Sequence, residues 1–158
     1  PGIALYGVGA DAKALDLRPV MSLKSTISTI KVFDPDTDIS YGRTFRTTGK
    51  TRVGVLPIGY ADGFFRGLSN RMSVITSQGP APLRGRICMD MTMVDLSDLP
   101  DIHVGDTVEI FGQKQSVDDL AALLDTIPYE LTCAVSKRVP RLYMEGGQMT
   151  ERSLRLLV

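Results

Sequence analysis

The segment RMSVITSQGPAPLRGRICMDMTMVDL, residues 71–96, contains three short stretches of apolar and β-branched residues. We expect strands at Arg71–Thr76, Pro82–Cys88 and Met91–Leu96, because such residues favour a pleated, half-buried surface. Gly79-Pro80 is a turn dipeptide between the first two stretches. Strands of this length at about ten-residue spacing predict a barrel or a sandwich.

The same pattern continues on both sides of this segment. Turn-forming residues such as Asp34-Pro35 and Gly105-Asp106 separate further extended stretches. The additional strands are expected at Pro19–Phe33, Ile39–Phe45, Arg52–Pro57, Thr107–Phe111 and Arg141–Met144. The residues alone therefore predict a mainly β domain.

Helices are expected only in the last third of the chain. Ser116 is a candidate N-cap, and the leucines that follow it lie at helical spacing on one apolar face. Pro128 should end this helix, because the residue before a proline is disfavoured in the α region. With a second helix at Tyr129–Val135 and a third at Glu151–Val158, the sequence predicts two or three short helices near the C-terminus.

The composition describes one domain without a strong charge. The chain has 158 residues, of which 43% are hydrophobic, and its 18 basic and 18 acidic residues cancel. A neutral chain has no overall attraction to nucleic acid or to an anionic membrane. The sequence shows neither a signal peptide nor an apolar stretch of about 18 residues. We expect a cytoplasmic protein with no nucleic-acid or membrane partner, and the start at Pro1 indicates a piece of a longer protein.

Cysteine and histidine are too scarce for a metal site. The chain has only Cys88, Cys133 and His103, whereas a tetrahedral site needs three or four ligands at close spacing. We expect free thiols in a reducing compartment, no metal, and a surface loop around His103. By residue type alone, Cys88 is a buried core residue.

Taken one at a time, the remaining candidates for chemistry are modest. Tyr41 by itself is typical of a packing residue, since a phenol with a pKa of about 10 is a poor base without a nearby cation. Arg43 and Arg46 are close enough in sequence to provide one. The glycine-containing stretch 58–63 is typical of a hairpin turn, and Lys24 of a lysine on a strand surface.

Taken together, these segments resemble alanine racemase, the fold-type III family that depends on pyridoxal 5'-phosphate (PLP). The motifs, in order, are PGIALYG (1–7), LRPVMSLKS (17–25), SYGRTF (40–45), PIGYADG (57–63), GRICMDMTMVD (85–95), VGDTVEIFG (104–112) and IPYELTCAVSKRVPRLY (127–143). The resemblance covers residues 1 to about 144 and only the C-terminal part of that family. The family's PLP-binding lysine motif, similar to VVKANAYG, does not occur in this chain.

The resemblance implies a fold and a domain boundary. Residues 1–14 match the tail end of the family's N-terminal (β/α)8 barrel, which is otherwise missing. Residues 15–158 match its C-terminal β-domain, a Greek-key-like antiparallel β-barrel.

The resemblance also implies roles for individual residues near the substrate. Tyr41 matches the catalytic tyrosine that takes or gives the α-proton on one face of the substrate, while the barrel lysine serves the other face. Met89 matches the residue whose backbone N–H holds the substrate carboxylate. Cys88 and Asp90 match residues that line the same site.

Cofactor and entrance positions follow in the same way. Tyr129 matches the tyrosine whose hydroxyl binds the PLP phosphate, and Gly2 and Ile3 match backbone donors to that phosphate. The family's entrance positions match Tyr60, Arg66, Arg86 and Ile127. Pro128 stands where the family usually has Asn, which leaves the local helix start and the entrance shape open.

The function implied is that of the C-terminal domain of an alanine racemase, which interconverts L- and D-alanine for peptidoglycan. In the family's homodimer, this domain delivers Tyr41 and Met89 to the barrel of the other subunit. Without the lysine, the isolated chain is expected to be inactive and to bind no PLP. Three alternatives stay open: a serine or broad-specificity racemase, a PLP-dependent decarboxylase, and a non-catalytic β-barrel module. The decarboxylases carry a GPxCD-type motif where this chain has GRICMD, and a binding module would not explain the combination of motifs.

Overall fold

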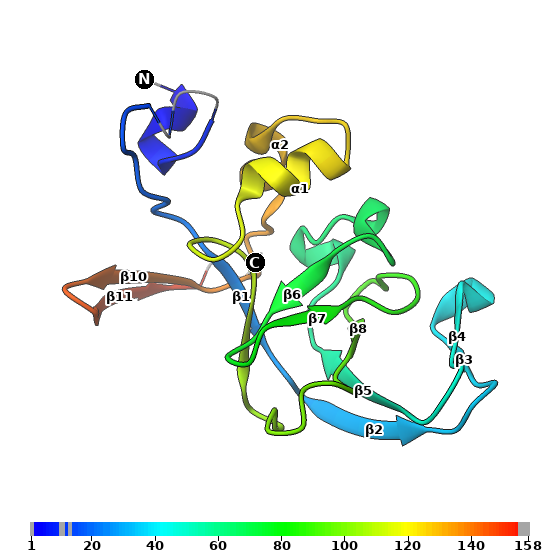
Figure 1. Cartoon of the computed structure of the whole chain (residues 1–158). Coiled ribbons are helices and arrows are strands. Elements are labelled where there is room, and N and C mark those ends of the chain that lie inside the picture. The colour runs from blue at the N-terminus through cyan, green and yellow to red at the C-terminus, as the bar shows by residue number, and fades with distance from the viewer. Residues whose placement is uncertain (1, 10–11, 13, 155–158) are drawn as a thin grey trace.

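The computed structural model describes residues 2–9, 12 and 14–154. Figure 1 shows a β-rich body with two short helices on one side and a hairpin that projects from it. The strands are β1 (Leu23–Thr26), β2 (Thr29–Phe33), β3 (Asp38–Ile39), β4 (Phe45–Arg46), β5 (Thr51–Leu56), β6 (Ser73–Ile75), β7 (Pro80–Pro82), β8 (Thr92–Asp95), β9 (Thr107–Phe111), β10 (Arg141–Glu145) and β11 (Gln148–Ser153). The helices are α1 (Val117–Leu123) and α2 (Pro128–Ala134), with short 3-10 helices η1 (Gly2–Tyr6), η2 (Tyr41–Arg43), η3 (Tyr60–Asp62) and η4 (Arg66–Leu68).

The strands pair in antiparallel fashion throughout the described residues. One sheet has the order β1-β9-β6-β7, a second has β2-β5-β8, and β3-β4 and β10-β11 form two-stranded sheets. An isolated bridge between Leu83 and Val94 joins the end of β7 to β8. The mainly β prediction is therefore confirmed, although the strand pairs of the described residues form separate sheets and do not close into a barrel.

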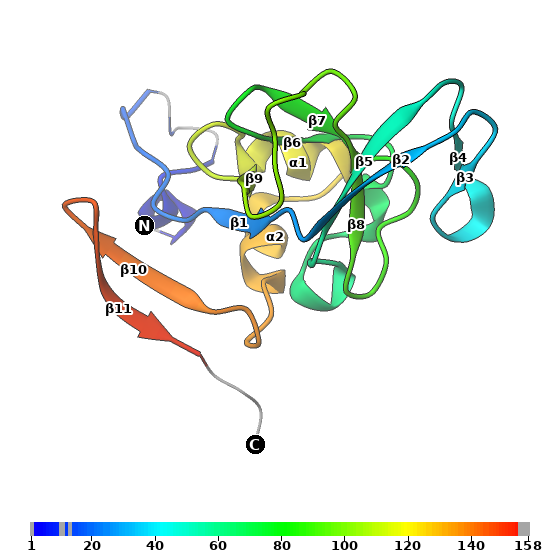
Figure 2. The same cartoon turned by 90° about the horizontal axis from the view of Figure 1, so that it is seen from below.

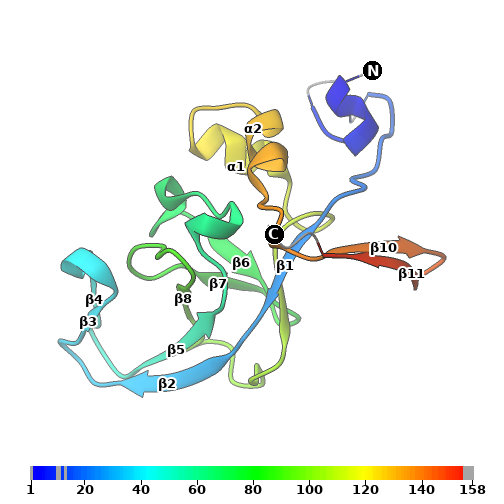
Figure 3. The same cartoon turned by 180° about the vertical axis from the view of Figure 1, so that it is seen from behind.

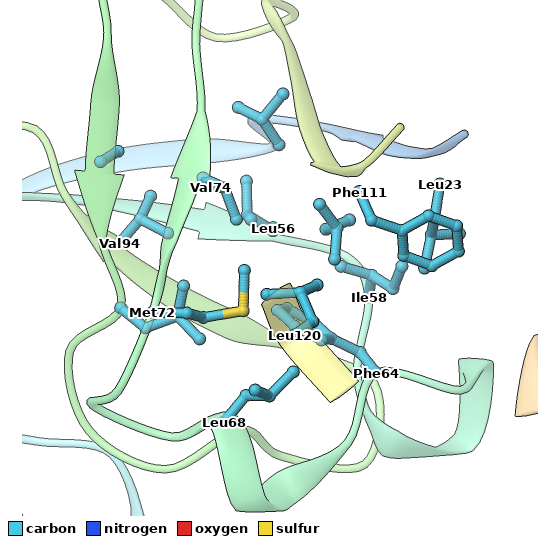
Figure 4. Packing of buried hydrophobic residues seen from close by; sticks show 14 of the residues in the cluster. Leu23, Leu56, Ile58, Phe64, Leu68, Met72, Val74, Val94, Phe111 and Leu120 are labelled. Carbon is cyan, nitrogen blue, oxygen red and sulfur yellow. The ribbon is translucent and has the colours of Figure 1, made fainter. Parts of the chain in front are cut away.

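The core lies between the two larger sheets. Residues of β8 alternate between buried and half-buried positions, as expected where one face of a sheet is covered, whereas four of the six residues of the central strand β5 are buried. Figure 4 shows Leu56, Val74 and Val94 from three strands meeting Phe64 and Leu68 from the η3–η4 region. Because Phe64 and Leu68 are almost fully buried, they anchor the η3–η4 region to the core.

The helical region begins as predicted and then departs from the prediction. The Ser116 hydroxyl oxygen accepts the N–H of Asp118 at 3.1 Å and so caps α1. The prediction that Pro128 ends this helix is wrong, because α1 already ends at Leu123 and Asp125 turns with φ of +56°. Pro128 instead begins α2, where its missing N–H costs no helical hydrogen bond.

Three further expected elements differ from the structure. The strand expected at Ile39–Phe45 is interrupted by η2. In place of the strand expected at Pro82–Cys88, the regular strand β7 already ends at Pro82. The helix expected at Glu151–Val158 is wrong for Glu151–Ser153, which pair with β10. Residues 155–158 lie outside the described residues. None of the helices in the described part of the chain is long and apolar enough to cross a membrane.

Candidate functional site

A surface hollow of about 360 Å³ collects most of the residues that the motifs singled out. It is lined by Tyr41, Tyr60, Arg66, Arg86, Cys88, Met89, Asp90 and Met91. Seven of these eight residues are site positions expected from the sequence, and Met91 is the addition. The lining comes from η2, from the η3–η4 region and from the loop between β7 and β8.

Two of these segments pack backbone against backbone. The N–H of Tyr60 donates to the carbonyl of Cys88 at 3.0 Å, and the N–H of Ala61 donates to that of Met89 at 3.0 Å. A Cβ on Gly59 would lie 2.3 Å from both carbonyl oxygens, so only glycine permits this approach. The stretch expected to be a hairpin turn is therefore the 3-10 turn η3, held on the 88–89 loop.

Met89 presents a backbone donor to this hollow. Its carbonyl oxygen accepts the N–H of Ala61, whereas among the described residues its own N–H has no hydrogen-bond acceptor. The Met89 side chain is 54% exposed. A free backbone N–H beside a hollow is a suitable donor for an oxyanion such as a carboxylate.

The charges around the hollow favour an anion. Among the described residues, neither Arg66 nor Arg86 takes part in an ion pair. The only carboxylate in the lining, Asp90, is bound by Arg138 at 2.5 Å, and Arg138 also binds Asp62 at 2.7 Å. Hydrogen bonds to Asp62 first, and then to Asp90, raise the pKa of Arg138 above its ordinary value. Within the part of the chain that the structure describes, Arg66 and Arg86 are thus left without a carboxylate partner.

Arg138 is a residue that the sequence analysis missed. It comes from the segment after α2 and joins η3 to the 88–91 loop through its two ion pairs. The one available signal was its place inside the motif IPYELTCAVSKRVPRLY, since isolated arginines on a loop carry no local pattern.

Tyr41 lies on η2 with 74% of its side chain exposed, so it is not a packing residue. The cations expected to help it face elsewhere: Arg43 and Arg46 lie 3.5 Å and 3.0 Å from Asp38. The hydrogen bond from Arg46 is the main cause of the lowered pKa of Asp38. The cation beside this turn is Arg86, whose guanidinium carbon would lie 3.2 Å from a Cβ on Gly42.

A second cluster gathers the expected phosphate contacts. The Tyr129 hydroxyl oxygen accepts the N–H of Ile3 at 3.3 Å. A Cβ on Gly2 would lie 3.1 Å from the same hydroxyl. Ile127 precedes α2 as its N-cap residue, is 56% exposed, and is not part of the lining of the hollow.

The structure does not bring the two clusters into one pocket. In Figures 1, 2 and 3, the β3–β4 turn that carries Tyr41 lies at the opposite side of the molecule from η1. Tyr129 is likewise absent from the lining of the hollow. One copy of this chain therefore presents the two clusters on different parts of its surface.

The expected surroundings of Cys88, His103 and Lys24 are confirmed. Both cysteines are free; Cys88 is buried and Cys133 is exposed. His103 is exposed between β8 and β9, and Lys24 is an exposed residue of β1. Within the described residues, no group of three or more His, Cys, Asp or Glu side chains could hold a metal ion.

Comparison with known proteins gives one consistent family. Residues 20–143 match the family model described as alanine racemase, C-terminal domain. Alanine racemase 1 of Clostridium acetobutylicum is 43% identical over 159 residues, which cover 96% of this chain and 41% of the relative. Alanine racemase 2 of Caldanaerobacter subterraneus is 46% identical over 94% of this chain and 40% of the relative. The chain thus spans about two fifths of the length of these curated relatives.

Solved structures agree with the sequence comparison. The alanine racemase of Clostridium difficile 630 in complex with cycloserine superposes with a TM-score of 0.92 at 43% identity, covering 99% of this chain and 43% of that one. The alanine racemase of Bacillus anthracis with bound L-Ala-P superposes with a TM-score of 0.88 at 30% identity, covering 97% and 41%.

Proposed function

Because this chain belongs to the alanine racemase family, with the C-terminal domain model matching most of its length, we propose that it supplies one part of the active site of a PLP-dependent alanine racemase. In this proposal it contributes a tyrosine base and the contacts to the substrate carboxylate. The relatives are isomerases named alanine racemases, which supports alanine as the substrate.

The hollow is the observation that carries the proposal. It places Tyr41 among Arg66, Arg86 and the free N–H of Met89. The backbone N–H of Met89 suits the carboxylate of a free amino acid, and the two arginines give the approach to it a positive charge. A phenol can take or give a proton when it is held beside the reacting carbon. Racemisation needs a proton carrier on each face of that carbon, because a single carrier returns the proton to the side that it left. Tyr41 is the carrier that this chain offers.

The second cluster fits the phosphate of PLP. The Ile3 N–H and the Tyr129 hydroxyl converge within 3.3 Å of each other, and a side chain at position 2 would crowd that hydroxyl. A hydroxyl and backbone N–H groups are ordinary ligands of a phosphate. When bound, PLP supplies an electron sink for the substrate carbanion. The role of Gly2, Ile3 and Tyr129 in this proposal is only to hold its phosphate.

We place the two clusters in the active sites of different subunits. One copy separates Tyr41 from Tyr129, so a homodimer that exchanges these surfaces completes each site, as the family resemblance implies. The barrel of the same family provides the PLP lysine, so the 158 residues alone should neither bind PLP nor turn over alanine. We assign the entrance of the site to Tyr60, Arg66, Arg86 and Ile127. We also propose that the full-length enzyme is cytoplasmic.

Tyr41→Phe in the full-length enzyme tests the proposed function. The change keeps the ring and removes the proton carrier, so the rate of the chemical step should fall by about 10²–10⁴-fold. Deuterium incorporation from solvent, started from each alanine enantiomer, should slow more on the Tyr41 face than on the lysine face. Serine run in parallel distinguishes an alanine enzyme from a broader one.

Tyr143→Phe is the matched control, since Tyr143 is an exposed tyrosine of the β10–β11 hairpin outside the lining of the hollow. It should racemise alanine at the wild-type rate. Equal and modest slowing of both directions by Tyr41→Phe would contradict the proposed role.

A further inference from the structure

Ser40, the residue before the proposed base, has a backbone conformation that residues other than glycine rarely adopt. Its φ is +67° and its ψ is 177°. This region of backbone conformation is essentially restricted to glycine, and another residue stays there only when its surroundings enforce it. Something in the structure must therefore hold Ser40 in place.

The contacts of the Ser40 side chain identify what holds it. Its hydroxyl donates to the carbonyl oxygen of Arg86 at 2.7 Å and lies 3.6 Å from the Cys88 sulfur. A Cβ on Gly85 would lie 2.5 Å from the Ser40 Cβ, so Ser40 rests directly on the backbone of that glycine. Ser40 is thus fastened to the segment 85–88, which leads into Met89.

Within one copy of the chain, the backbone of η2 decides where the Tyr41 ring lies. Its side chain is 74% exposed, so the position of the phenol follows from the backbone of η2. That backbone begins at Ser40 and is crowded at Gly42 by the Arg86 guanidinium. The Ser40 hydroxyl therefore joins the start of the turn with the base to the segment that leads to the carboxylate-binding N–H. The end of the turn is joined to the same segment through Asn70, whose side chain accepts the N–H of Gly85 at 2.6 Å and donates to the Thr44 hydroxyl at 3.2 Å.

We propose that Ser40 is a positioning residue for Tyr41, which sets the place of the phenol relative to the Met89 N–H by bonding the Arg86 carbonyl. The inference rests on the proposed function, because it assigns Ser40 a part in the same site. This positioning role differs from a role in stability. The strained backbone of Ser40 would lower stability, but it places the Tyr41 phenol.

Two substitutions in the full-length enzyme separate position from stability. Ser40→Ala keeps the strained backbone and loses the hydroxyl. Ser40→Gly also loses the hydroxyl but removes the strain, because glycine adopts positive φ readily. A displacement of about 1 Å can cost about 10²-fold in rate, so kcat should fall by about 10- to 100-fold in both variants. Ser40→Gly should nevertheless melt at the same temperature as the wild type or higher.

The same variants have a readout that needs neither substrate nor cofactor. Hydrogen exchange of a peptide covering residues 40–46, measured on the cofactor-free enzyme, should quicken in both variants because the turn loses its attachment. With cofactor and alanine, deuterium incorporation on the Tyr41 face should slow more than on the opposite face. Ser28→Ala is the matched control, since the Ser28 hydroxyl also donates to a backbone carbonyl, that of Val55 at 3.0 Å, away from the hollow.

The possible outcomes are distinct. Wild-type kcat in either Ser40 variant, with Tyr41→Phe strongly impaired, would overturn the positioning role and leave the proposed function intact. Equal slowing on both faces, or a loss of rate that follows melting temperature, would also overturn it. If Tyr41→Phe itself keeps its rate, the proposed function fails, and the positioning role of Ser40 fails with it.

Discussion

Among the glycines near the hollow, Gly59 has the least room for a side chain. An alanine methyl there would lie 2.3 Å from the carbonyl oxygens of Cys88 and Met89, and both oxygens belong to backbone that cannot rotate away. We expect Gly59→Ala to lower the free energy of unfolding by about 3 kcal/mol, at the upper end of overpacking. Urea denaturation measures this.

Gly49 provides the comparison for this prediction. A Cβ there meets nothing within 4 Å, and its φ lies outside the left-handed range. Gly49→Ala should therefore leave stability unchanged or raise it by up to about 1 kcal/mol, through the unfolded chain. Similar losses in the two variants would show that contact with the 88–89 loop is not what requires glycine.

At the scale of elements, the start of α2 is set by Pro128. Ile127 is extended and gives no side-chain cap, so the proline ring supplies the helical φ of the first position in advance. Pro128→Ala should lower the free energy of unfolding by up to about 1 kcal/mol, because the unfolded chain gains freedom. Thermal melting measures it, and Pro128→Asn, the usual family residue, should behave in the same way. A gain in stability from either variant would contradict this account.

Asp95, the last residue of β8, is stabilised in its charged form. Partial burial raises the pKa of Asp95, but hydrogen bonds from the Ser97 hydroxyl and N–H and from Arg84 outweigh it, so the pKa lies below its ordinary value. Because the folded pKa is the lower one, Asp95 contributes stability above the unfolded pKa of 3.8. That contribution is lost as the pH falls through the folded pKa.

Ser97→Ala tests this linkage. Removal of the hydroxyl should raise the folded pKa of Asp95 toward 3.8 and move acid unfolding to higher pH. A carbon-13 NMR titration of the Asp95 carboxyl group follows the first change, and circular dichroism follows the second. An unchanged titration would show that the Ser97 hydroxyl does not lower this pKa, and would assign the lowering to the N–H of residue 97 and to Arg84.

At the scale of the whole molecule, stability should differ between the body and the terminal hairpin. β10 and β11 pair with each other and project from the body, and their residues Leu142, Tyr143, Met144 and Met149 are all more than half exposed. A two-stranded hairpin is only marginally stable by itself. Native-state hydrogen exchange should therefore open the hairpin amides well before those of β5, which is paired on both sides. Equal protection of β5 and β10 would show that the hairpin unfolds only with the core.

Local residue patterns were sufficient for most of the strands and for the two helices. Alternating or β-branched stretches marked β5, β6, β8 and β9, and leucines at helical spacing marked α1, because these signals depend on neighbours in the chain. The strand at Glu151–Ser153 was missed because its structure comes from pairing with β10. The turn at Tyr41–Arg43 was missed because its backbone conformation depends on Gly85 and Arg86, more than forty positions away.

By itself the sequence determined that this protein is a mainly antiparallel β domain of the alanine racemase family. It also identified nearly every residue that lines the hollow. Both results follow from residue types and their order along the chain, which are properties of the sequence. Tertiary structure alone decided which of those residues meet. It joins Arg138 to carboxylates 76 and 48 positions away, and it leaves Tyr41 and Tyr129 on separate surfaces. Such meetings depend on how sheets and loops pack in space, and packing joins positions that no local pattern relates.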